Sequence, residues 1–214
     1  MLVCSAAVSQ TNHNSPDQEP VGAAINIAVS NLDVGEGNVY FSEAERNERD
    51  GAYDEALNLF GKAAFEYNSA GQFSRYCSAL MRLSNVHYLL THYTEAEQVV
   101  LNVALKNYAK IGSRSGQMES YGQLGKIYLA SNKLTQSLWF YTQQGIIARQ
   151  IGSSYANIES VLGIANVKIK RKEYMMAAQD LNKAELLARS ANTSAFKSQI
   201  RVARALIPSR KSKS

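Results

Sequence analysis

Large apolar residues recur along the chain at helical spacing, and this pattern itself repeats about every 40 residues. The segments that start at positions 53, 93, 134 and 174 read YDEA, YTEA, LTQS and YMMA, and their spacing is almost constant. The repetition predicts four equivalent helices. Each of these helices carries a large apolar residue at a later turn, namely Phe60, Val100, Tyr141 and Leu181.

A second helical run precedes each of these segments, so the repeating unit is predicted to be a helical hairpin. Short polar turns at 91–92, 131–133 and 171–173 join the two helices. In the last three copies the first helix is marked at matched offsets by Leu80, Leu83 and His87, by Tyr121, Leu124 and Tyr128, and by Val161, Ile164 and Lys168. Each hairpin ends near a residue suited to a left-handed C-cap, and these residues are Gly71, Gly112, Gly152 and Asn192.

One hairpin of this kind leaves an apolar face unburied, so the copies are predicted to stack on one another. The fold class that follows is all-α: a right-handed α-solenoid of about four hairpins with a concave and a convex side. The repeats fall at about 38–71, 72–112, 113–152 and 153–192. No proline interrupts the chain between Val21 and Ile207, which agrees with continuous helices.

The segments that flank the repeats have their own expected roles. Residues 1–20 are expected to be a disordered leader, and residues 21–37 to pack on the first repeat, with a helix over the apolar stretch 21–32. The first repeat is the least regular, since Glu43-Ala44 stands where a Leu-Gly pair would be expected. Residues 193–207 are expected to form a capping helix, and 208–214 a basic tail.

In the third repeat, Leu124-Gly125 stands between Tyr121 and Tyr128 and is followed by Leu134, Ser137 and Tyr141. On these residues the repeat resembles a tetratricopeptide repeat. The ordinary motif spans about 34 residues, whereas a period near 40 is more similar to the long-helix variety of Leu-Gly-Asn repeat adaptors, kinesin light chains and bacterial regulator sensors. The resemblance covers about residues 38–192 and implies a non-catalytic, protein-binding solenoid. The likeness to the long-helix variety rests also on the triplets Leu83-Ser84-Asn85, Leu124-Gly125-Lys126 and Ile164-Ala165-Asn166.

Small residues stand where the two helices of each hairpin should cross closely. A branched Cβ atom at a close crossing would push the two backbones apart. On the second helices these residues are Ala56, Ala96, Ser137 and Ala177, which should face Ala44, Ser84, Gly125 and Ala165 on the first helices.

The first helices should line the concave side, where equivalent positions form ladders across the repeats. One ladder is entirely polar and reads Glu45, Asn85, Lys126 and Asn166. A primary amide both donates and accepts hydrogen bonds, so a row of amides can hold an extended peptide backbone. The family resemblance implies that role for Asn85 and Asn166, and Lys126 would favour a carboxylate on the ligand. Neighbouring positions add Met81, Arg82, Tyr88, Gln123, Leu129, Leu162 and Lys170 to the predicted groove.

Composition and charge narrow the classes of activity. Hydrophobic residues make up 45% of the chain and charged residues 19%, as in an ordinary globular protein. The net charge of +5 is uneven, because residues 168–214 hold 12 basic and 3 acidic side chains, which leaves +9 there. That end should attract anions, although no aromatic residues interleave the tail, which disfavours nucleic acid.

No pattern in the sequence indicates catalysis, a metal or a cofactor. His87 and His92 are five positions apart, which does not align them on one helix face, and the two cysteines lack metal-ligand spacing. Glycines at 116, 122 and 125 lie in helical pattern, so they indicate close packing and no phosphate loop. We therefore expect no enzyme activity and no cofactor.

The cellular compartment stays open. Residues 1–10 are small and apolar and resemble the end of a secretory signal peptide, but a basic start and most of an apolar core are missing. This incomplete signal favours the cytoplasm slightly over export. No segment approaches the roughly 20 apolar residues that a membrane-spanning helix needs.

Three functions agree with these observations. The first is a non-catalytic adaptor that binds a protein or peptide segment in the concave groove, with self-association through the ends of the array as a further use. The second is the sensory or regulatory repeat region of a signalling system. The third is an electrostatic binder of nucleic acid or anionic membrane through the basic C-terminal quarter.

Overall fold

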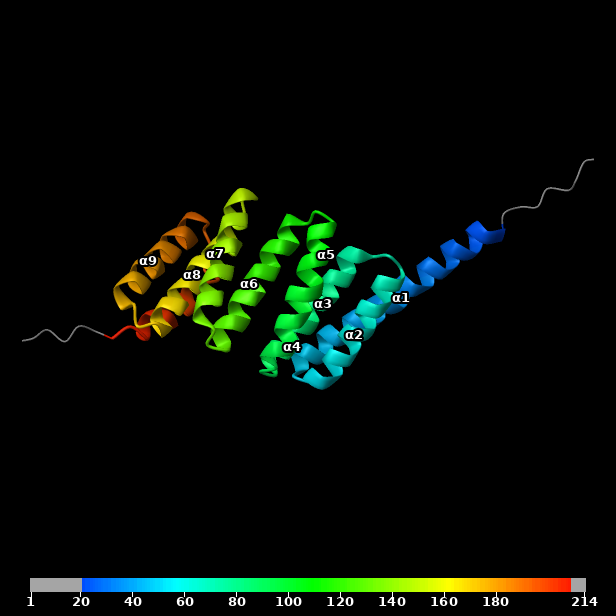
Figure 1. Cartoon of the computed structure of the whole chain (residues 1–214), viewed down its shortest axis with the longest axis horizontal. Coiled ribbons are helices and arrows are strands. Elements are labelled where there is room, and N and C mark those ends of the chain that lie inside the picture. The colour runs from blue at the N-terminus through cyan, green and yellow to red at the C-terminus, as the bar shows by residue number, and fades with distance from the viewer. Residues whose placement is uncertain (1–20, 209–214) are drawn as a thin grey trace, which may run out of the picture.

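Helices pack one after another along a single line in the computed structural model, which describes residues 21–208 and the side chains from residue 35 onward (Figure 1). The described residues contain no strand, and they form nine helices when α4, η1 and α5 are counted as one continuous helix. Each helix contacts the next along the chain. The prediction of an all-α solenoid is confirmed, while the predicted leader 1–20 and tail residues 209–214 lie outside the described residues.

The helices pair into four hairpins and a final helix. The first helices of the hairpins are α1 (Val21–Asp50), α3 (Phe73–Leu89), α6 (Arg114–Ala130) and α8 (Ser154–Lys170). The second helices are α2 (Tyr53–Ser69), the continuous run of α4 (Tyr93–Gln98), η1 (Val99–Ala104) and α5 (Leu105–Lys110), then α7 (Leu134–Gln150) and α9 (Tyr174–Ser190). The last helix is α10 (Lys197–Ala205).

Residues with left-handed backbone mark every helix boundary inside the array. At the end of α2, for example, Gly71 has φ of 68° and the amide of Gln72 donates to the carbonyl of Tyr67 at 2.8 Å. Such a turn satisfies the last carbonyls of a helix and reverses the chain. The predicted C-caps are thus confirmed. The left-handed residues between hairpins are Gly71, Gly112, Gly152 and Asn192, and those within hairpins are Gly51, Thr91, Asn132 and Lys172.

These boundaries are evenly spaced along the chain, except that the interval from Thr91 to Gly112 is longer than the others by a single position. The second helix in that interval is lengthened to match, since it runs from Tyr93 to Lys110 whereas α2, α7 and α9 have 17 residues each. The π-helical stretch η1 lies in the middle of that longer helix. A π-helical turn absorbs an inserted residue without shifting the helix ends, so the array keeps its register here.

The first helix is longer than the repeat requires. Residues 21–50 form one unbroken helix whose first turns extend past the end of α2 (Figure 1), so residues 21–37 are not a separate element. No proline falls between residues 21 and 50 to end the helix earlier. Within the described side chains, Gly37 is buried, and a Cβ atom there would lie 2.9 Å from Cε1 of Tyr67. This part of α1 therefore packs directly on α2.

The predicted close crossings within each hairpin are confirmed. All eight small residues at these positions are buried. In the second hairpin the Ser84 hydroxyl donates to the carbonyl of Ala96 at 3.0 Å, and in the third the Ser137 hydroxyl donates to the carbonyl of Gly125 at 2.8 Å. A side-chain hydroxyl can reach the backbone of the facing helix only where the two helices lie very close together.

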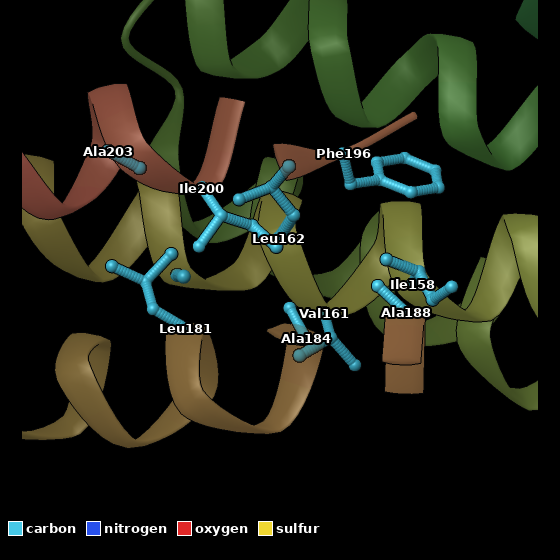
Figure 2. Packing of buried hydrophobic residues seen from close by; sticks show 10 residues of the cluster. Ile158, Val161, Leu162, Leu181, Ala184, Ala188, Phe196, Ile200 and Ala203 are labelled. Carbon is cyan, nitrogen blue, oxygen red and sulfur yellow. The ribbon is translucent and has the colours of Figure 1, made fainter. Parts of the chain in front are cut away.

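The last helix closes the apolar end of the fourth hairpin. Phe196, Ile200 and Ala203 point toward α8 and α9 and are buried in a cluster with Leu162 and Leu181 (Figure 2). The prediction of a capping helix is confirmed in position and orientation. Its regular part is shorter than the predicted 193–207, because residues 193–196 form the turn that leads into α10.

Candidate functional site

A groove of about 510 Å³ lies along the first helices of the last three hairpins. Its walls come from α3, α6 and α8, and α10 closes one end. Six residues of the predicted site line this groove. The first helices of these three hairpins therefore share one hollow. These six are Tyr88, Lys126, Leu129, Leu162, Asn166 and Lys170, and the other lining residues are Ala130, Tyr141, Tyr155, Glu159, Gly163, Phe196 and Gln199.

Asn166 presents an unpaired amide to this groove. Its side chain is half-buried and makes no hydrogen bond with any described residue. An amide offers two donors and an acceptor, so this position can pair with both the N–H and the C=O group of a peptide unit. Asn166 therefore has the chemistry that the polar ladder predicted.

Tyr141 reaches the groove from the second helix of its hairpin. Its ring lies between Gly125 and Gly163, where added Cβ atoms would be 2.8 Å and 2.5 Å from the ring carbons. The residue is 3% exposed, and its hydroxyl has no hydrogen-bond partner among residues 35–208. Burial, and then the negative charge of Glu159, raise the pKa of Tyr141, so the hydroxyl stays protonated and can donate.

Sequence reasoning assigned Tyr141 to the core only, because it follows the apolar pattern of α7. The signal that it also reaches the groove is the pair of glycines on two successive first helices. Without side chains at Gly125 and Gly163, a ring from the layer behind can pass between those helices. This position was missed because the spacing of glycines was interpreted only as close helix packing.

Glu159 contacts two other helices at the groove through its two carboxylate oxygens. Its Oε1 atom lies 2.8 Å from Nζ of Lys126, and its Oε2 atom accepts a hydrogen bond of 2.6 Å from Nε2 of Gln144. The charge of Lys126 is thus matched by a neighbouring first helix. Lys126 is therefore ion-paired within the groove, and its preference for a ligand carboxylate stays a prediction.

The remaining predicted lining residues have structural contacts as well. Lys170 donates from Nζ to the backbone carbonyl of Leu129 at 2.9 Å and so ties the end of α6 to α8. Leu162 is 4% exposed and belongs both to the groove floor and to the core beneath α10. These contacts connect adjacent repeats and give the groove a fixed wall.

The N-terminal half of the predicted ladder forms a separate cluster on α1 and α3. Arg82 lies 2.6 Å from Glu48 and 3.6 Å from Glu45, and Nδ2 of Asn85 donates to Glu48 at 2.7 Å. These contacts lie within the cluster, and Glu45, Arg82 and Asn85 are not among the residues that line the groove with Asn166. Glu48, which organises the cluster, was missing from the predicted site.

Two further predicted residues lie between helices. Met81 packs in the core that joins the second and third hairpins, and its sulfur lies 3.7 Å from the hydroxyl of Ser120. Gln123 is 7% exposed, and its buried Nε2 atom has no hydrogen-bond partner among the described residues. Both positions contribute to packing between repeats and do not reach the groove.

The two histidines of the second hairpin do not make a metal site. The His87 and His92 rings lie 6.0 Å apart, but within the described residues no group of three or more His, Cys, Asp or Glu side chains could hold a metal ion. Across that same region, no helix is both long and apolar enough to cross a membrane.

No family model matches the chain, and a search of curated proteins finds no match.

Proposed function

We propose that this chain is a non-catalytic adaptor of the tetratricopeptide-repeat type, which binds a segment of another protein in the groove between α3, α6, α8 and α10. One observation carries the proposal: the unpaired amide of Asn166 lies in a groove formed by equivalent faces of successive repeats. A repeat array that offers such a surface can contact an extended or helical segment along several turns.

The groove combines the two kinds of contact that peptide binding needs. Asn166, Tyr88 and Tyr141 supply groups for hydrogen bonds to a backbone, and Leu129 and Tyr155 supply apolar surface for side chains. The exposed lining of the groove is more polar than apolar, so hydrogen bonds to a peptide backbone should provide most of the contacts. Tyr155 is 59% exposed at the rim, where its ring packs on Phe196.

The proposal is tested by comparing Asn166→Ala with Asn68→Ala as bait in capture from an extract of the source cells. Both substitutions remove the same atoms, but Asn68 is exposed on α2 and lies outside the groove. Captured proteins are quantified by mass spectrometry, with wild type as the reference. We expect at least one protein to fall about tenfold with Asn166→Ala, the equivalent of about 1.4 kcal/mol, and to be unchanged with Asn68→Ala.

Thermal melting of both variants separates binding from folding. Because the Asn166 side chain makes no hydrogen bond among the described residues, its removal should leave the melting temperature within about 2 °C of wild type. If no captured protein depends on Asn166 while both variants remain folded, the groove is not the binding surface and the proposal is wrong.

A further inference from the structure

A second hollow, of about 470 Å³, lies between α9 and α10 on the C-terminal end of the array. It is distinct from the groove, because Phe196 just before α10 and Gln199 on α10 line the groove, whereas Lys197, Arg201 and Arg204 line this cleft. We propose that the cleft binds a phosphate monoester, carried either by a small molecule or by a phosphorylated side chain.

Four cations and one carboxylate line the cleft, which leaves an excess of three positive charges. The cations are Arg189 at the end of α9 and Lys197, Arg201 and Arg204 on α10, and the carboxylate is Glu185. The three residues on α10 are spaced i, i+4 and i+7, so they share one face of that helix. The fold therefore collects positive charge from two elements on opposite sides of one hollow.

Glu185 holds two of these cations in place. Its Oε1 atom lies 2.7 Å from Arg189, and its Oε2 atom lies 3.0 Å from Arg204, which also donates to Asn182 at 2.9 Å. Both oxygens of the single carboxylate are thus engaged. Lys197 and Arg201 have no carboxylate partner among the described residues, so their charges remain available to an anion.

The cleft is bounded by α9, by α10 and by the turn that joins them. Ala188 and Ile200 form its apolar floor, and both belong to the core beneath α10 (Figure 2). The hydroxyls of Thr193 and Ser194 stand on the connecting turn and add polar groups to the wall. A hollow closed on two sides suits one phosphate group, whereas a nucleic-acid backbone or a membrane needs an extended basic surface.

The charge of the ligand follows from the excess in the cleft. A phosphate monoester carries close to two negative charges at neutral pH and offers three strong acceptor oxygens. Arginine donors match such an oxygen set in forked geometry, and charge-assisted hydrogen bonds of this kind are the strong ones. A single carboxylate would neutralise only part of the excess of three charges.

The test is calorimetric titration of the whole chain at fixed ionic strength with inorganic phosphate, O-phospho-L-serine and the tripeptide acetyl-Gly-phosphoserine-Gly-amide. Acetate and the unphosphorylated tripeptide serve as controls. The test variant is Lys197→Gln/Arg201→Gln. The matched control is Lys172→Gln/Lys183→Gln, which also removes two positive charges, but from exposed positions outside the cleft. Both test positions are exposed, so neither variant should unfold.

We expect the phosphate probes to bind wild type and the control alike, and to bind Lys197→Gln/Arg201→Gln at least about tenfold more weakly. Stronger binding of the phosphotripeptide than of inorganic phosphate would identify a phosphorylated protein as the source, and equal binding a small molecule. Equal weakening in both variants, or no binding at millimolar concentration, would overturn the proposal. So would preferential binding of a single-stranded RNA or of phosphatidylserine vesicles that depends on Lys197 and Arg201.

Discussion

A single methyl group at Gly163 should destabilise the array, because Tyr141 occupies the space beside it. A Cβ atom there would meet Cε1 and Cζ of the Tyr141 ring at 2.5 Å. The ring has little room to retreat, since a Cβ atom added at Gly125 on its other side would also lie only 2.8 Å from it and the residue is 3% exposed. Either α6 and α8 must separate or the ring must leave its position.

The size of the effect is the difference between two terms. Overpacking in a well-packed core costs about 1–3 kcal/mol. Replacement of glycine by alanine inside a helix stabilises the folded state by about 1 kcal/mol, because alanine has the higher helix propensity. The clash should exceed the gain, so Gly163→Ala should lower the free energy of unfolding by up to about 2 kcal/mol and the melting temperature by up to about 8 °C.

Gly61→Ala is the matched control, because Gly61 lies inside α2 with no atom within 4 Å of an added Cβ. It should raise stability by up to about 1 kcal/mol in the same urea denaturation. In a Tyr141→Ala background, Gly163→Ala should no longer lower the free energy of unfolding, since the clashing ring is absent. A destabilising Gly163→Ala in that background, or a stabilising one in wild type, would refute the assigned packing of Tyr141.

Four further predictions concern folding and reactivity. Ala177→Leu, at a crossing that is fully buried, should spread the fourth hairpin and cost about 1–3 kcal/mol in urea denaturation; an unchanged midpoint would show that the crossing is elsewhere. Ser137→Ala removes the 2.8 Å hydrogen bond to the Gly125 carbonyl and should cost about 1 kcal/mol, whereas no loss would show that the bond contributes nothing. Burial lowers the pKa of His87 in the folded chain, so the unfolded chain takes up a proton first. Stability should therefore fall as the pH drops through about 6.5, and the fall should be smaller in His87→Gln, as seen by denaturation at pH 7.5 and 5.5. Burial raises the pKa of the Cys77 thiol to about 11, so maleimide should label this residue only under unfolding conditions. Peptide mass spectrometry measures the labelling, and rapid labelling of the native protein would contradict the burial of Cys77.

Most of the fold followed from the sequence because the repeat is read from several independent features. Small residues at the crossings, left-handed caps and the recurring tetrapeptides all point to the same hairpin. The slightly longer interval between Tyr93 and Leu134 was also visible. Its consequence, a π-helical stretch inside one helix, could not be predicted, because an inserted residue can be absorbed in a turn as easily as in a helix.

The candidate site was predicted less completely than the fold. The ladder predicted that Lys126 and Asn166 lie on one shared face of the first helices, and both residues line the groove. The ladder did not distinguish Asn85 from these two residues, although the Asn85 amide donates a hydrogen bond to Glu48 on another helix. Pairings across helices depend on side-chain reach and on the neighbouring repeat, and a periodic pattern within one chain does not contain them.

Site-specific photocrosslinking tests the central claim most directly. A benzoylphenylalanine residue replaces Tyr155 at the rim of the groove or, as the control, replaces Trp139, which is 52% exposed and does not line it. Irradiation in the source-cell extract should give a protein adduct from position 155 that is absent when Asn166→Ala is added, and none from position 139. Adducts from position 139 alone, or adducts from position 155 that do not depend on Asn166, would contradict a protein-binding groove.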